Sequence, residues 1–302
     1  MIRIGTRGSP LALAQAALVR ASLGADAELV PIRTEGDRRA EARLAVIGGK
    51  GLFVREIEDA LLRGDVDVAV HSLKDLPAEI PAGLVLRAFL PREDPRDVLV
   101  SRAPATLETL PPGAVVGTSS PRRRALVLAV RPDVVVEPIR GNVDTRLRKL
   151  ADSGYDAVVL AAAGLRRLEL APPHCTPLDV ETFVPAVGQG IVAVQARGDD
   201  PSTLARLARV DDATARACAE AERAYLAELG ASCTTPVAAH ARADGGVLRM
   251  TAIVASEDGR RILRSSAAAA PHEAARLGRG LAEALLARGA ARIVDLQPSG
   301  RS

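Results

Sequence analysis

The chain has 302 residues, enough for two or three domains, and 48% of them are hydrophobic. Aromatic residues make up only 2%, with no Trp, so a nucleic-acid site built on stacked aromatic rings is poorly supported. The net charge of +3 comes from 40 basic and 37 acidic residues, which argues against a bulk polyanion binder and leaves room only for a local anion site.

The basic residues and the cysteines further limit the kinds of site and the cellular compartment that we expect. Nearly all basic residues are Arg, with Lys only at 50, 74 and 149, so a retained Lys indicates a place where a compact ammonium differs from a guanidinium. The cysteines at 175, 218 and 233 are odd in number and lack metal-ligand spacing, which favours a reduced compartment and no metal. We expect a cytoplasmic protein, because the sequence has no convincing signal peptide and no apolar run long enough to span a membrane.

The first 170 residues alternate short apolar strands with amphipathic helices. In chain order, we expect strands at 2–5, 27–32, 67–70, 84–90, 97–100, 114–118, 134–139 and 156–162. We expect helices at 10–23, 52–64, 121–130 and 143–154. This alternation favours α/β units with largely parallel strands.

Two helix starts share one plan, at 3–15 and at 115–127: a strand, Gly-Thr, a polar turn, Ser-Pro and a helix. Ser at the N-cap followed by Pro is a strong helix start, so the repeat predicts two similar α/β domains. The stretch 91–97, "PREDPRD", suits a linker, and a further strand at 191–196 is expected to return the chain to the first domain. The predicted limits are 1–90 with 186–209 for the first domain and 96–185 for the second.

The pattern changes after residue 210. A long helix at 213–229 precedes strands separated by Gly-containing turns, and a last helix closes the chain at 272–290. The expected strands are 237–243, 247–256 and 261–268. We therefore predict a smaller α+β domain over 212–302 with a three-stranded antiparallel sheet.

The stretch "GTSSPRRR" places hydroxyl side chains before a helix and cations in its first turn, at Thr118, Ser119, Ser120, Arg122 and Arg123. Free N–H groups and the helix dipole favour an anion there, and cations in a first turn indicate an anionic ligand that offsets their repulsion. The alternative is a solvated basic turn. Arg7 and Ser9 repeat the pattern more weakly in the first domain.

Further arginines follow the ends of successive strands, at Arg140, Arg146 and Arg167. Ligands of α/β proteins bind at such strand ends, and Arg holds carboxylate or phosphate groups with two hydrogen bonds. These residues therefore indicate a carboxylate or phosphate pocket, although each could alone be an ordinary surface residue. The glycine-rich stretches 47–51 and 188–193 lack the context of a phosphate loop or a dinucleotide site.

Two stretches could carry chemistry. In "HSLKDLP", Asp75 beside Lys74 at a strand end could stabilise a cationic intermediate, or it could simply cap a turn. In "LGASCTTP", Cys233 lies in a loop and could act as a nucleophile, although a lone thiol is more often inert.

Taken together, these stretches resemble the hydroxymethylbilane synthase (porphobilinogen deaminase) family over essentially the whole chain. The resemblance is carried, in the family's order, by "TRGSPLALAQ", "GGKGLF", "AVHSLKDLP", "REDPRD", "GTSSPRRR", "IRGNVDTRL", "AGLRRL", "PAVGQG" and "ERAYLAELGASCTTP". It implies two α/β domains like those of periplasmic binding proteins, followed by the α+β domain. It also implies a transferase of porphyrin, tetrapyrrole and haem biosynthesis that condenses four porphobilinogen molecules with loss of ammonia and releases hydroxymethylbilane.

The resemblance further implies a dipyrromethane cofactor held by a thioether at Cys233, Asp75 as the catalytic carboxylate, and a monomer. The implied cofactor-binding residues, besides Cys233, are Lys74, Thr118, Ser119, Ser120, Arg122, Arg123, Arg140, Gly141 and Arg146. The implied substrate-binding residues are Arg7, Ser9, Lys50, Arg167 and Gln189. Two positions depart from the family: Ala231-Ser232 stands where Gly-Gly usually precedes the cysteine, and Val46 stands where some members have Lys.

Two rival interpretations remain at this point. A non-enzymatic two-domain anion-binding protein would explain the domains and arginines but would need neither Asp75 nor Cys233. A Cys-dependent transferase of another kind would need a base near Cys233, and no His in the sequence suggests itself for that role.

Overall fold

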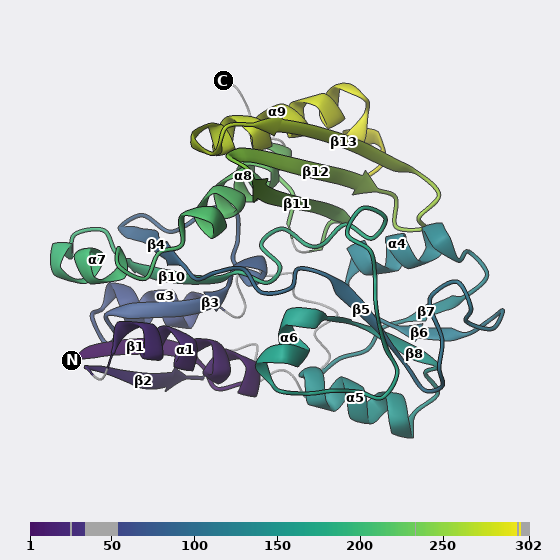
Figure 1. The fold of residues 1–302 in the computed structure, drawn as a ribbon, viewed down its shortest axis with the longest axis horizontal. Coiled ribbons are helices and arrows are strands. Elements are labelled where there is room, and N and C mark those ends of the chain that lie inside the picture. The colour runs from purple at the N-terminus through teal and green to yellow at the C-terminus, as the bar shows by residue number, and fades with distance from the viewer. Residues whose placement is uncertain (25, 34–53, 233, 295, 297–302) are drawn as a thin grey trace.

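The computed structural model describes residues 1–24, 26–33, 54–232, 234–294 and 296. These residues form three units, each built on its own sheet, with the first sheet, the second sheet and the C-terminal sheet clearly separated in space (Figure 1). Lys50 and Cys233 lie outside the described residues.

The first sheet has the strand order β2-β1-β3-β10-β4. Its strands are β1 (Ile2–Arg7), β2 (Ala27–Ile32), β3 (Val68–Ser72), β4 (Leu84–Phe89) and β10 (Val192–Arg197). Helices α1 (Pro10–Leu23), α3 (Arg55–Leu62) and α7 (Pro201–Leu207) pack against it. Strand β1 pairs in parallel with β2 and β3, while β10 runs antiparallel to both β3 and β4.

The second sheet has the order β7-β6-β8-β5-β9. Its strands are β5 (Asp97–Ser101), β6 (Val115–Gly117), β7 (Val135–Glu137), β8 (Ala157–Ala161) and β9 (Cys175–Pro177), and its helices are α4 (Pro121–Val130), α5 (Val143–Asp152) and α6 (Ala162–Arg167). Strands β7, β6 and β8 are parallel, and β5 runs antiparallel to β8 and β9. Both sheets therefore share one plan: four strands run in the same direction, and one strand, β10 or β5, runs against them.

The expected Ser-Pro helix starts are present in both units. The Ser9 side chain accepts a hydrogen bond from the Ala12 N–H at the start of α1, and Ser120 accepts one from the Arg123 N–H at the start of α4. In each case Pro follows, where the missing N–H costs nothing.

The C-terminal unit is a three-stranded antiparallel sheet, β11 (Val237–Asp244), β12 (Val247–Ala255) and β13 (Ile262–Ala269), covered by α8 (Ala213–Leu229) and α9 (Ala274–Ala287). The two helices lie unusually close, because a Cβ on Gly278 would sit 2.0 Å from the Ala221 carbonyl oxygen. The predicted fold class, two α/β domains plus a smaller α+β domain with a three-stranded antiparallel sheet, is confirmed.

Two crossings join the first and second sheets, one between β4 and β5 and one leading from the second sheet back to β10 (Figure 1). Backbone hydrogen bonds connect the two chain segments: the Leu90 N–H donates to the Val192 carbonyl at 3.0 Å, and the Glu93 N–H donates to the Gly190 carbonyl at 3.1 Å. Gly190 has φ +89°, and a Cβ there would lie 2.3 Å from the Glu93 carbonyl oxygen. The sheet membership of β10 supports a discontinuous first domain, while the exact domain limits stay a prediction.

Among the described residues, no helix is both long and apolar enough to cross a membrane. The same residues contain no cluster of His, Cys, Asp and Glu side chains arranged to hold a metal ion.

Candidate active site

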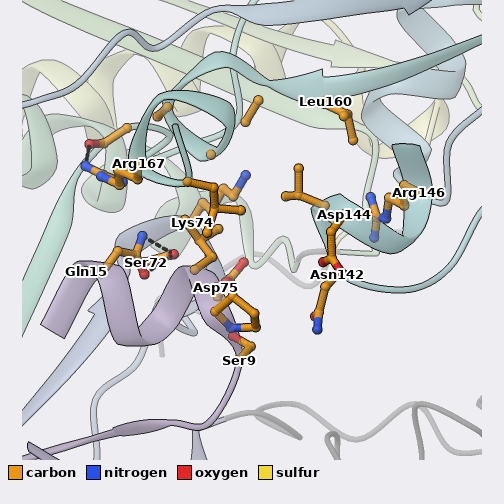
Figure 2. A pocket seen from close by; sticks show the side chains of 18 of the residues that line it. Ser9, Gln15, Ser72, Lys74, Asp75, Asn142, Asp144, Arg146, Leu160 and Arg167 are labelled. Carbon is orange, nitrogen blue, oxygen red and sulfur yellow. Dashed lines mark hydrogen bonds between the residues drawn. The ribbon is translucent and has the colours of Figure 1, made fainter. Parts of the chain in front are cut away.

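A cleft of about 250 Å³ lies between the first two units, beside the crossings (Figure 2). It is lined from the first unit by the start of α1 and the end of β3, and from the second unit by the start of α5 and by α6. Helices α1 and α6, one from each unit, also contact each other directly.

Lys74 and Asp75 enter the cleft from a short 3-10 turn, Leu73–Asp75, that follows β3. Leu73 is 1% exposed and Leu76 is 4% exposed, and the Leu73 N–H donates to the Ile191 carbonyl at 3.0 Å. The two leucines anchor the turn in the core beside the returning crossing. The charged residues between them are therefore directed outward, and the Asp75 side chain is exposed in the cleft.

Five cationic side chains of the described residues line the cleft: those of Arg7, Lys74, Arg123, Arg146 and Arg167. Lys74 donates to the Gln189 Oε1 at 3.4 Å, and burial together with the neighbouring Arg123 lowers its pKa to about 8. Burial and Arg123 likewise lower the pKa of Arg146 to about 10, and burial lowers the pKa of Arg167. Cations that are disfavoured in this way are stabilised by anionic ligands.

Hydrogen bonds fix two of these arginines at the edges of the cleft. The Arg146 Nε donates to the Gly141 carbonyl at 2.8 Å, and an Arg167 Nη donates to the Gly190 carbonyl at 2.6 Å. Each guanidinium is therefore oriented by the backbone while keeping further N–H donors for a ligand.

Two carboxylates among the described residues, those of Asp75 and Asp144, also line the cleft. Asp144 lies in the first turn of α5, where a negative charge suits the helix dipole. Asp75 lies beside Lys74, and its charge supports the protonated forms of both Lys74 and Arg146 by raising their pKa values.

The start of α4 differs from the sequence-based expectation. Arg122 is 4% exposed and does not line the cleft: it forms an ion pair with Asp97 at 2.8 Å and donates to the Val184 carbonyl at 2.8 Å. The anion that offsets the first-turn cations in this structure is thus the Asp97 carboxylate. Arg123 binds the same carboxylate and also lines the cleft.

The remaining predicted residues divide into two groups. Ser9 and Gly141 line the cleft, the latter with φ +113°. Thr118, Ser119, Ser120, Arg140 and Gln189 do not line it. Among these, Ser119 donates to the Ile139 carbonyl at 2.8 Å, Arg140 is exposed, and Gln189 is buried beside Asp97.

Sequence reasoning did not assign several residues of this region: Gln15, Ser72, Asp97, Asn142 and Asp144. Gln15 donates to the Ser72 hydroxyl at 2.8 Å at the cleft wall. The sequence signal available for Gln15 was a polar residue on the otherwise apolar face of α1. The signal for Asp97 was an acidic residue at the start of an apolar strand.

The site therefore combines an exposed carboxylate with several partly desolvated cations. Such a cleft can hold a ligand rich in carboxylates and can stabilise a positive charge that develops near Asp75.

Comparison with known proteins covers nearly the whole chain. Residues 2–205 match the family described as "Porphobilinogen deaminase, dipyromethane cofactor binding domain", and residues 216–287 match "Porphobilinogen deaminase, C-terminal domain". The chain is 46% identical over 306 residues to a porphobilinogen deaminase of Syntrophotalea carbinolica, covering 99% of this chain and 97% of that one. It is 49% identical over 298 residues to one of Xanthomonas campestris, covering 97% and 98%.

A solved structure, the periplasmic VFT2 domain of Bordetella pertussis BvgS, aligns with a TM-score of 0.42 at 15% identity, covering 69% of this chain and 86% of that chain.

Proposed function

The chain belongs to the porphobilinogen deaminase family, and we propose that its cleft performs the family's transferase reaction with Asp75 as the catalytic carboxylate. In that reaction four porphobilinogen molecules are joined head to tail with loss of ammonia, and the linear product hydroxymethylbilane is released by water. The observation that carries the proposal is the exposed Asp75 carboxylate in a cleft that is also lined, among the described residues, by five cationic side chains.

The cations suit the substrate. Each pyrrole ring of porphobilinogen carries an acetate and a propionate, so a growing chain brings many carboxylates into the cleft. Arg7, Lys74, Arg123, Arg146 and Arg167 supply donors on both sides of it. Because burial lowers the pKa of Lys74, Arg146 and Arg167, a bound carboxylate would also relieve the electrostatic cost of these groups.

The same cations suit the dipyrromethane cofactor, which is built from two substrate units and supplies the free pyrrole carbon on which the chain grows. Lys74, Arg123 and Arg146 are the cleft residues that would hold its carboxylates. From the family pattern, Thr118, Ser119, Ser120, Arg122, Arg140 and Gly141 remain further proposed contacts, and Ser9 and Lys50 remain proposed substrate contacts. Gln189, which does not line the cleft, would act on substrate binding through Lys74, whose Nζ donates to it.

Asp75 would act by stabilising a positive charge that develops on the substrate. Loss of ammonia from the aminomethyl group leaves a species that is cationic when protonated, and a fixed carboxylate near the pyrrole nitrogen stabilises that charge as it develops. The same carboxylate could accept a proton released when the pyrrole carbon attacks. Lys74 beside it would bind a substrate carboxylate, so the adjacent opposite charges would serve opposite ends of one ligand.

The test of Asp75 compares two isosteric changes in one cleft. Asp75→Asn should leave a folded protein and reduce kcat by a factor of about a thousand, the size expected for loss of a principal electrostatic stabiliser. Asp144→Asn removes the other cleft carboxylate and should change kcat by less than about threefold. Near-normal turnover in Asp75→Asn would refute the proposed role.

Attachment of the cofactor is tested by the intact mass of the denatured protein. We propose a thioether at Cys233, with an adduct equal to two substrate units less two ammonias. Cys233→Ser should lose this adduct, whereas Cys175→Ser, which changes an exposed cysteine on β9, should keep it. An adduct that survives Cys233→Ser would contradict the assignment.

We also propose a cytoplasmic monomer that binds no nucleic acid. The large exposed apolar side chains of the described residues are scattered over separate elements: Met1, Leu18, Leu62, Val85, Val130, Val135 and Ile262. Scattered apolar residues are ordinary on a monomer surface. Light scattering at micromolar concentration should give the mass of one chain, and a dimer mass would contradict the proposal.

A further inference from the structure

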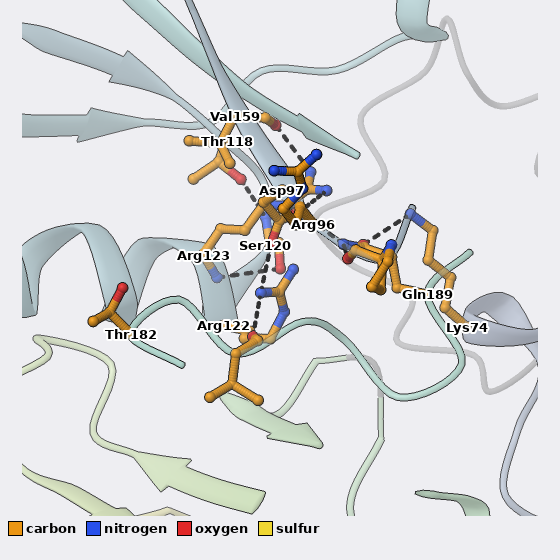
Figure 3. Close-up of polar contacts among 12 residues, drawn as sticks. Lys74, Arg96, Asp97, Thr118, Ser120, Arg122, Arg123, Val159, Thr182 and Gln189 are labelled. Carbon is orange, nitrogen blue, oxygen red and sulfur yellow. Dashed lines mark hydrogen bonds and ion pairs between the residues drawn. The ribbon is translucent and has the colours of Figure 1, made fainter. Parts of the chain in front are cut away.

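Asp97 is a buried carboxylate outside the cleft that holds groups belonging to it (Figure 3). It opens β5 at the end of the first crossing and is 0% exposed. Its Oδ1 accepts hydrogen bonds from the Arg123 Nε at 3.0 Å, from an Arg123 Nη at 2.7 Å and from the Gln189 Nε2 at 3.1 Å. Its Oδ2 lies 2.8 Å from an Arg122 Nη as an ion pair.

These contacts reach both sides of the cleft. Arg123 belongs to α4 in the second unit and lines the cleft. Gln189 belongs to the returning crossing, and its Oε1 accepts from the Lys74 Nζ at 3.4 Å, while Lys74 belongs to the turn after β3 in the first unit. One carboxylate is therefore connected, directly or through one amide, to a cleft cation on each side.

The charge balance around Asp97 is unusual. Burial alone would raise the pKa of Asp97, but Arg122 and Arg123 outweigh burial and hold it well below its ordinary value, so the carboxyl group is ionised. The titratable groups that face Lys74 are Asp75 on its own turn, Asp97 on β5, and Arg122 and Arg123 on α4; Arg7, Arg146 and Arg167 line the same cleft. Asp97 is thus the buried anion within a cationic group.

We propose that Asp97 is a positioning residue for the condensation: it sets the direction of the Arg123 guanidinium and, through Gln189, of the Lys74 ammonium, so that both cations meet the carboxylates of one ligand. This inference rests on the proposed function. Asp97 itself touches no part of the cleft, so it acts only through the side chains that it holds.

The contact with Asp97 fixes the guanidinium of Arg123 at the place where this residue lines the cleft. Two N–H groups of Arg123 are held on a single oxygen, and a third donates to the Val159 carbonyl at 2.9 Å, which leaves little freedom for the guanidinium plane. Because the substrate carboxylates are present before and during the reaction, loss of this positioning should weaken binding more than it slows the chemistry.

The test is steady-state kinetics of Asp97→Asn, an isosteric change that removes the charge. We expect KM for porphobilinogen to rise at least about tenfold while kcat changes by less than about threefold. Since KM does not depend on the fraction of enzyme that is folded, a purely structural role would lower the thermal stability and the yield but leave KM unchanged. Asp97→Glu keeps the charge and should recover part of the KM.

A second readout is the alkaline side of the pH profile. Asp97 raises the pKa of Lys74 through its charge, so Asp97→Asn should move the pH at which kcat/KM falls to a lower value. Loss of packing alone would expose Lys74 to water and move this pH to a higher value instead, because burial is what lowers the pKa of Lys74.

Asp97→Asn leaves two buried guanidiniums without their anionic partner and could fail to fold. In that case a second variant tests the positioning role of Asp97. Gln189→Met breaks the connection from Asp97 to Lys74 but leaves every charge in place, and it should raise KM about threefold or more. An unchanged KM in the folded variants would overturn the proposal. Asp75→Asn, measured in parallel, separates the two ideas: normal turnover there contradicts the proposed function instead.

Discussion

Glu222 on α8 should be one of the most sensitive positions for stability. It is 0% exposed, and it accepts hydrogen bonds from Arg92 at 2.5 Å, from the Gly188 N–H at 2.6 Å and from the Ala241 N–H at 2.7 Å. Arg92 lies on the first crossing and Gly188 on the second, so this carboxylate ties the C-terminal unit to both. The change to test is Glu222→Gln.

The expected loss follows from these contacts. Removing one partner of a buried ion pair costs about 3–5 kcal/mol, because the other charge stays buried without compensation. In Glu222→Gln the new amide N–H₂ must also face a backbone N–H donor, either that of Gly188 or that of Ala241. We therefore expect the free energy of unfolding to fall by about 4 kcal/mol, a large part of the 5–15 kcal/mol that is typical of folded proteins.

Urea unfolding followed by circular dichroism measures this loss. The control is Arg166→Gln, which removes two ion pairs at 2.8 Å, to Glu93 and Asp94, from a side chain that is 56% exposed. Surface pairs contribute about 0–1 kcal/mol, so the control should change little. A loss below about 1 kcal/mol in Glu222→Gln, equal to the control, would refute the reasoning.

Three further predictions concern pH and the crossings. Because burial lowers the pKa of Lys74 to about 8, kcat/KM should fall as the pH rises through about 8, and Lys74→Met should abolish this fall. Between about pH 8 and 10.5 the unfolded chain binds more protons at Lys74 than the folded chain does, so the free energy of unfolding should rise with pH. Burial lowers the pKa of His71 to about 4, so the Tm should fall as the pH drops from 6.5 toward 4, and His71→Gln should flatten that slope. Gly190→Ala should cost at least about 1–3 kcal/mol in urea unfolding, since φ is +89° and the new Cβ meets Glu93, whereas Gly154→Ala, which meets nothing within 4 Å, should not.

Much of the fold could be predicted because its signals are local. The Ser-Pro starts and the apolar strands fixed most element positions to within a few residues. The short helices α6 and α7 and the three-residue strand β9 were missed, since none is long enough to show a period. A local start signal was present for α7, where Asp200 caps the helix and Pro201 follows. The antiparallel direction of β5 and β10 depends on how the crossings pass between the sheets, which no local pattern records.

The site residues, too, could be predicted only where the signal lies in the local sequence. The sequence correctly indicates a cationic cluster with Lys74 and Asp75 at a strand end. It does not distinguish Arg122 from Arg123, because neighbours on a helix point about 100° apart and only the packing of α4 against the rest of the unit decides which one lines the cleft. Both bind Asp97, which lies on another element.

The position of β10 has a consequence for the order in which the chain can fold during synthesis. Strand β4 pairs with β10 in the described sheet, so residues 84–89 have no permanent neighbour until residues 192–197 have been made. The second sheet, by contrast, has all its strands once residue 177 has left the ribosome. The sheet that begins at the N-terminus is therefore completed after the second sheet, against the usual N-terminal-first order. A chain that ends between 178 and 191 would expose an unpaired strand edge, which is the kind of surface that aggregates.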